Sequence, residues 1–319
     1  MLKKVFCLIF SAVLVLSVLA GCAPKEETPP ETTVDIMANA LYKEDPADDG
    51  VFQMLMIGNS GCTYFIDELD GMFEAAGINA DVYALYYSGC DVQRHWNWLG
   101  DHSPNYELHH AGAATKNSYT LANALKEQNW DVISLQQAFW PEMTDNLPYA
   151  TDSTLPFAKG LYDHIKSVFP LSDLYWHETW AYQVGFNWRG TTPLDQVAEN
   201  MKVLSVEKQT AMYEVIRTVS QGGCEENGVP MVPVADAWQI ARANPLIGDT
   251  LCNRLSDGGD NLHDGDIGGG QFLNASVWFE TLSGKSCLDN TFRPSKYPLD
   301  EEKVAALQQA AHQAVEALK

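Results

Sequence analysis

Short apolar runs alternate with longer amphipathic runs along most of the chain. Continuous apolar stretches bounded by turn residues are typical of buried strands, whereas apolar residues spaced three and four apart indicate helices. By these patterns we expect strands at 52–57, 80–86, 132–135, 174–176 and 230–235. The same patterns predict helices at 64–76, 117–128, 154–168, 194–219, 270–282 and 301–318.

This alternation of strands and helices predicts the fold class. Short apolar strands separated by helices imply a parallel sheet that is covered on both faces. With right-handed crossovers, the result is a three-layer α/β/α sandwich around a five-stranded parallel sheet. In such sheets binding sites lie outside the carboxyl ends of the strands, so the residues that follow each strand are the first candidates for function.

The N-terminus has the pattern of an export signal. Lys3 and Lys4 precede an apolar run at 5–20, and Leu19-Ala20-Gly21-Cys22 follows. The run is too short for a comfortable membrane span. It resembles a bacterial lipoprotein signal that is cleaved before Cys22, so that Cys22 carries lipid and anchors the protein to the extracytoplasmic face of a cell membrane. The alternatives are an uncleaved anchor and an ordinary signal peptide with a chance cysteine.

The domain limits follow from composition. Residues 1–21 form the expected signal peptide, and 22–50 are rich in Pro and acidic residues with few apolar ones, which is typical of a flexible tether. Residues 51–319 are long enough for one large domain and contain neither a second linker nor an internal repeat.

Charge and cysteine content exclude several classes of partner and cofactor. The formal net charge is −22, which argues against nucleic acid and against anionic surfaces. Seven cysteines are present, but no pair has the Cys-x-x-Cys spacing of a metal site, so we expect no metal. Cys62 and Cys90 both follow predicted strands, so a disulfide between them stays open alongside two free thiols.

Two loops carry candidate catalytic chemistry. Ser60 follows the first strand directly, where it is either part of an ordinary turn or helix cap with Asn59 or a nucleophile. A nucleophilic serine needs a histidine base and a carboxylate that orients it. Asp260 and His263 stand three residues apart in one late loop and could supply both groups. A solvated loop, or a calcium-like cluster of the acidic residues there, would also explain that segment.

Three sequence blocks, taken in order, resemble those of the SGNH (GDSL-like) hydrolases, and especially a bacterial subset classed as a domain of unknown function. The blocks are Ile57-Gly58-Asn59-Ser60, Ser88-Gly89-Cys90 followed by His95-Trp96-Asn97, and Asp260 with His263. The resemblance implies a flavodoxin-like strand order of 2-1-3-4-5. It also implies Ser60 as nucleophile, His263 as base, Asp260 as orienter, and the N–H groups of Ser60 and Gly89 as the oxyanion hole.

The chain departs from the family pattern at two places. Asn59 stands where the family usually has Asp, and the third block, Gly-x-Asn-Asp, is absent after the third strand. The family's oxyanion asparagine is therefore missing. Gln136 and Gln137 carry the same amide at that strand end, and strand alternation points them in opposite directions. We expect Gln137 to serve as the third donor, with a structural role for both glutamines as the alternative.

The predicted function is that of a serine esterase, which needs no cofactor. Nine tryptophans are present, several of them after strand ends, and indole rings suit carbohydrate surfaces. We therefore expect removal of O-acetyl or other acyl groups from a carbohydrate, with His95, Trp96, Trp140 and Trp180 in substrate binding. The alternative is a non-catalytic lipoprotein that binds carbohydrate or another solute with the same fold. His177 and Glu178, at the end of the fourth strand, either bind substrate or form a buried pair, and His109 and His110 are expected in a loop.

Overall fold

A seven-stranded sheet with the order β4-β3-β2-β1-β5-β6-β7 forms the centre of the protein. The computed structural model describes residues 50–140, 143–184, 205–249, 269–295 and 298–319, and these belong to one compact unit. β1 pairs in parallel with β2 and β5, and β6 continues the parallel part on to β7. The strands are β1 (Phe52–Gly58), β2 (Ala80–Tyr86), β3 (Tyr106–His110), β4 (Ala113–Tyr119), β5 (Val132–Gln136), β6 (Asp173–His177) and β7 (Met231–Val232).

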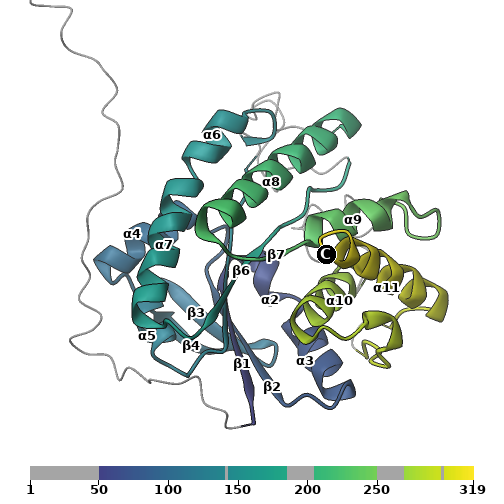
Figure 1. The fold of residues 1–319 in the computed structure, drawn as a ribbon, viewed down its shortest axis with the longest axis horizontal. Coiled ribbons are helices and arrows are strands. Elements are labelled where there is room, and N and C mark those ends of the chain that lie inside the picture. The colour runs from purple at the N-terminus through teal and green to yellow at the C-terminus, as the bar shows by residue number, and fades with distance from the viewer. Residues whose placement is uncertain (1–49, 141–142, 185–204, 250–268, 296–297) are drawn as a thin grey trace, which may run out of the picture. The chain divides into compact units, whose positions relative to one another are not determined.

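Helices cover both faces of this sheet, as the alternating pattern predicts (Figure 1). One face carries α3 (Ile66–Ala75), α9 (Val234–Ala243), α10 (Gly269–Ser283) and α11 (Glu301–Glu316). The other carries α4 (Val92–Asp101), α5 (Leu121–Leu125), α7 (Leu155–Val168) and α8 (Val206–Asn227). The short helices α2 (Ser60–Thr63) and α6 (Leu147–Asp152) and the 3₁₀ turn η5 (Cys287–Asp289) complete the described elements.

Alternation along β1 explains the two cores. Met54 and Met56 lie fully buried in the cluster beneath α3 and α10, whereas Leu55 and Ile57 lie in the cluster beneath α7. A strand buried on both faces reads as a continuous apolar run, which is the pattern of 52–57. The strand order of the parallel part is the 2-1-3-4-5 order that the SGNH resemblance implies, and the α/β/α sandwich is confirmed.

The number of strands is a correction. Five parallel strands were expected, but an antiparallel hairpin of β3 and β4 extends the sheet beyond β2. β4 includes the first residues of the helix expected at 117–128, and within that range only α5 is helical. His109 and His110 lie on β3 rather than in a loop. Most of β4 is exposed, so its polar residues show no apolar alternation that would have revealed a strand.

The second half of the sequence also differs from expectation. The strand expected at 230–235 has only the two residues of β7, and α9 begins directly after Pro233. α4 and α6 were not expected at all. The helix expected at 194–219 is α8, which runs on to Asn227, and the residues before Ser205 lie outside the described part. None of the described helices is long and apolar enough to cross a membrane. The expected signal peptide, Cys22 and nearly all of the tether lie outside the described residues.

Candidate active site

Ser60 is the first residue of α2, immediately past the carboxyl end of β1. Asn59 precedes it as the helix N-cap, and its side-chain oxygen accepts a hydrogen bond from the Gly61 N–H at 2.9 Å. The cap that the sequence allowed is therefore present, but Asn59 forms it. Ser60 is partly exposed and lines a pocket, so its hydroxyl is available to a ligand.

Gly58 ends β1 because another side chain occupies the space above it. Gln136, at the end of β5, crosses this position, and a Cβ on Gly58 would lie 2.5 Å from the Gln136 Cγ. The Gln136 amide then reaches Asn59, where Nε2 donates to Oδ1 at 2.6 Å. The break from apolar strand to Gly-Asn-Ser thus makes room for a buried glutamine that contacts the serine turn.

Asn59 also joins the serine turn to the turn between β2 and α4. Its Nδ2 donates to the Cys90 carbonyl at 3.2 Å. An aspartate at this position could not donate that bond, which gives a physical reason for the departure from the family's usual residue. Gly89, next to Cys90, has a φ of +59°, and a Cβ there would lie 2.6 Å from the ring of Trp140. Both facts require glycine at 89.

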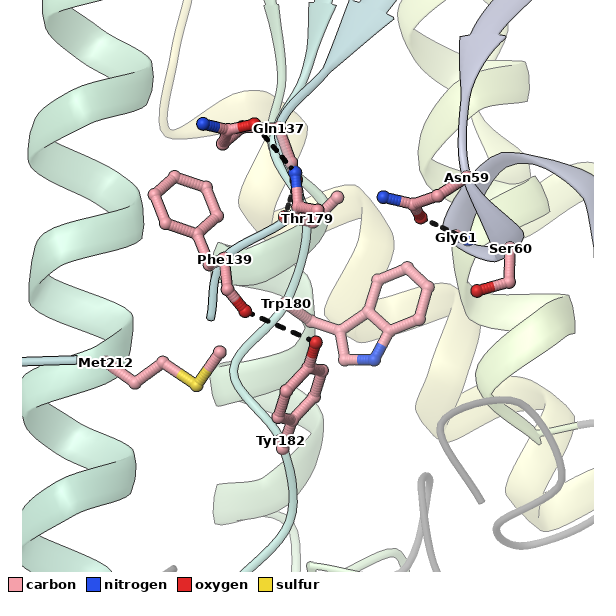
Figure 2. A pocket seen from close by; sticks show the side chains of 10 residues that line it. Asn59, Ser60, Gly61, Gln137, Phe139, Thr179, Trp180, Tyr182 and Met212 are labelled. Carbon is pink, nitrogen blue, oxygen red and sulfur yellow. Dashed lines mark hydrogen bonds between the residues drawn. The ribbon is translucent and has the colours of Figure 1, made fainter. Parts of the chain in front are cut away.

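The two glutamines at the end of β5 point in opposite directions, as strand alternation predicts. The side chain of Gln137 is fully buried; its Oε1 accepts from the N–H groups of Val92 and Ala138, and its Nε2 donates to Thr154 at 2.7 Å. Figure 2 shows this amide turned away from Ser60. The geometry therefore does not favour Gln137 as the third oxyanion donor, and the amide that reaches the serine turn is that of Gln136.

A pocket opens beside Ser60, toward β5 and β6 (Figure 2). Its empty space, including the part open to solvent, is about 330 Å³. In this view Trp180 lies between Ser60 and the apolar side chains of Phe139 and Met212. Its ring stacks on the ring of Trp238, with the two ring centroids 4.6 Å apart. The lining residues are Asn59, Ser60, Gly61, Gln137, Ala138, Phe139, Thr179, Trp180, Tyr182 and Met212.

The expected substrate-binding residues divide into two groups. Trp180 lines the pocket, and Trp140 lies against Gly89. His95 is fully buried, its Nδ1 lies 2.8 Å from the Tyr106 hydroxyl, and burial lowers its pKa to about 3. Trp96, on α4, packs against Gly160 of α7, where a Cβ would lie 2.7 Å from the indole. His95 and Trp96 are therefore corrected to packing residues of α4.

His177 and Glu178 are buried, as one of the two interpretations predicted, but they do not pair. The ring of His177 packs edge-on against Phe65 and Trp278, and neither of its nitrogens has a hydrogen-bond partner among the described residues. Burial lowers its pKa to about 3. Glu178 accepts from the Asp236 N–H at 3.3 Å, and burial, then the neighbouring Asp236 carboxylate, raise its pKa to about 8.

Two further expectations can be placed. Cys62 and Cys90 are both free and buried, and burial raises the pKa of each thiol, so the disulfide is not formed. Asp260 and His263 lie outside the described residues, and so does the acidic segment considered as a calcium-like cluster. Their roles as orienter and base remain predictions from the resemblance.

Sequence reasoning missed most of the apolar pocket wall. Phe139 follows β5, Tyr182 lies beyond β6, and Met212 comes from the middle of α8, so no local pattern links them. Position after a strand end was a usable signal for Phe139 and Tyr182. Nothing in the sequence distinguishes Met212 from the other buried residues of an amphipathic helix.

The comparison with protein families is decisive for classification. Residues 53–314 match the family described as Domain of unknown function (DUF4886). The chain belongs to this family. A crystal structure of a DUF4886 family protein from Bacteroides uniformis is similar to it, with a TM-score of 0.67 and 27% sequence identity over 83% of this chain and 95% of that one. No curated protein matches this DUF4886 protein.

More distant similarities to two other solved structures were also found. A putative GDSL-like lipase from Parabacteroides merdae has a TM-score of 0.46 and 14% identity over 73% of this chain and 96% of that one. An acetyl xylan esterase has a TM-score of 0.43 and 11% identity over 72% of this chain and 100% of that one.

Proposed function

We propose that this DUF4886 protein is a serine hydrolase that cleaves carboxylic esters. The observation that supports it most directly is the position of Ser60, at the first turn after β1, with its side chain facing an apolar pocket. The turn that carries Gly89 is tied to the serine turn through Asn59 and the Cys90 carbonyl. Nucleophile and oxyanion donors therefore stand on two turns held together by one buried side chain.

The proposed reaction follows the usual course of acyl transfer. His263 accepts the Ser60 hydroxyl proton as Oγ attacks the ester carbonyl, and Asp260 orients the imidazole and stabilises its cation. The N–H groups of Ser60 and Gly89 stabilise the negative charge that develops on the carbonyl oxygen. Collapse of the tetrahedral intermediate expels the alcohol, which takes the proton from His263. A water molecule, activated by the same histidine, then releases the acid and restores Ser60.

The pocket favours a short acyl group. Phe139 and Met212 are almost fully buried, and the stacked pair of Trp180 and Trp238 limits movement of the indole that lies next to Ser60. We infer from this packing that the pocket accepts an acetyl group more readily than a long aliphatic chain. Aromatic side chains beside the nucleophile also suit a sugar as the alcohol part. We therefore propose O-acetyl groups of a surface carbohydrate as the substrate class, with the enzyme anchored to the cell membrane by lipid on Cys22.

Replacement of the nucleophile tests the proposal. We expect Ser60→Ala to keep the fold, measured by circular dichroism and melting temperature, and to lower turnover of p-nitrophenyl acetate by at least ~10³-fold. His263→Ala should have a similar effect, and Asp260→Ala a smaller one, because it only orients and stabilises. A fluorophosphonate should label the wild type at Ser60 and leave Ser60→Ala unlabelled.

The same experiment distinguishes the esterase from the alternative, a lipoprotein that binds carbohydrate without hydrolysing it. A wild-type protein that neither hydrolyses short esters nor reacts with the fluorophosphonate, yet retains affinity for an acetylated polysaccharide, is a binding lipoprotein and not an esterase. A clear preference for long-chain lipid esters over acetylated xylan or pectin would contradict the carbohydrate substrate and leave the serine hydrolase standing.

A further inference from the structure

Gln136 combines features that packing alone does not explain. Its side chain is 1% exposed, and it occupies space that excludes any side chain at position 58. Its Nε2 donates to Asn59, but within the described part of the chain its Oε1 has no hydrogen-bond partner. A buried acceptor without a partner destabilises the folded state relative to an apolar residue of the same shape. The position thus holds a residue that costs stability.

The contact that Gln136 makes determines how Asn59 is oriented. The Asn59 oxygen accepts from Gln136 Nε2 and from the Gly61 N–H, and both donors require oxygen rather than nitrogen at that end of the amide. The opposite end is then the Nδ2 group, which donates to the Cys90 carbonyl. Gln136 therefore helps to hold the Asn59 amide in the only orientation that links the two turns.

We infer that Gln136 is a positioning residue for ester hydrolysis, acting through Asn59 on the distance between the serine turn and the Gly89 turn. The inference rests on the proposed function, because those turns carry the two proposed oxyanion donors, Ser60 and Gly89. Preorganised donors contribute to the rate by being in place when charge develops on the substrate oxygen. A residue that fixes their separation affects the chemical step more than substrate binding.

The test compares two substitutions of the same kind. Gln136→Met keeps the shape of the side chain and removes its donor and its unpaired acceptor. Gln308→Met is the matched control, because Gln308 is 4% exposed and its Nε2 donates to the carbonyls of Cys287 and Asn290, beneath α11. With p-nitrophenyl acetate we expect Gln136→Met to lower kcat about 10- to 100-fold, with little change in KM or melting temperature. Gln308→Met should lower the melting temperature and leave kcat near that of the wild type.

A second variant keeps the inference testable if Gln136→Met fails to fold. Asn59→Asp retains the acceptor for Gln136 and Gly61 but loses the donor to Cys90, and we expect it to lower kcat without a matching rise in KM. If the wild type is active and Gln136→Met changes kcat no more than Gln308→Met does, the inference is overturned and the proposed function still stands. A rise in KM without loss of kcat in either site variant would also overturn it. A wild type that neither hydrolyses esters nor reacts with a fluorophosphonate would overturn the proposed function together with it.

Discussion

At the scale of single residues, the site is defined by what buried polar groups contact. Within the described residues the side-chain amide of Asn59 makes three hydrogen bonds, to Gln136, Gly61 and Cys90, and these join three segments that are far apart in sequence. Ser60, one residue on, lines the pocket. The chain thus places its buried amides behind Ser60, the proposed nucleophile, and leaves Ser60 at the edge of the pocket.

Glu178 makes stability depend on pH in a predictable direction. Its pKa is raised from 4.5 to about 8 because the carboxyl is buried and faces Asp236, with Arg217 as the opposing cation. Between these values the unfolded chain releases a proton that the folded protein keeps, so the free energy of unfolding falls as pH rises from 4.5 to 8. Glu178→Gln removes this titration. We expect the melting temperature of the variant, relative to wild type, to rise between pH 5 and pH 9.

The control for this prediction is Glu214→Gln, at an exposed position of α8 that faces solvent rather than the sheet. Its melting temperature relative to wild type should stay constant over the same pH range. A constant difference for Glu178→Gln as well would show that the carboxyl does not titrate between the two states.

At the scale of elements, α8 supplies Met212 to the wall of the pocket. Met212→Ala removes most of that side chain, so we expect the ratio of turnover of p-nitrophenyl octanoate to acetate to increase about 10-fold, as expected for a few buried methylenes. The substitution should also lower the free energy of unfolding by about 2–5 kcal/mol, as for other buried Met→Ala changes.

Met143→Ala is the matched control for the pocket prediction. Met143 belongs to the same apolar cluster as Met212 and is equally buried, but it does not line the pocket. We expect a similar loss of stability with an unchanged ratio of octanoate to acetate turnover. Equal shifts of the ratio in both variants would indicate general loosening of the fold and contradict a specific role for Met212.

The elements also show how far the sequence determines the structure. The limits of β2 were predicted to the residue, and α7 and α10 to within one, because their apolar patterns are strong. The β3–β4 hairpin was missed because β4 lies at the sheet edge with most of its side chains in solvent. Alternation shows that the side chains of Gln136 and Gln137 point in opposite directions, but not which of them lies over Gly58 and reaches Asn59. That choice depends on the pairing of Ile57 with Leu135, which is a tertiary contact.

At the scale of the whole molecule, net charge and the proposed lipid anchor bear on where the proposed esterase would work. A net charge of −22 gives the protein no electrostatic attraction to anionic lipid or nucleic acid. Retention at a membrane would therefore depend on the lipid proposed for Cys22. The proposed lipid on Cys22, followed by a tether that extends to residue 50, would leave the hydrolase domain free to reach polysaccharide at the cell surface.

Replacement of Cys22 tests this arrangement. A thioether-linked lipid contributes about 0.8 kcal/mol for each buried CH₂ group, so its loss should release the protein from the membrane. We expect wild-type protein to enter the detergent phase of a Triton X-114 extraction and to carry an acylated N-terminus by mass spectrometry. Cys22→Ser should remain in the aqueous phase, whereas Cys7→Ser, within the expected signal peptide, should behave as wild type. Wild-type protein found free in the medium without acylation would refute the anchor, and the esterase proposal would then apply to a secreted enzyme.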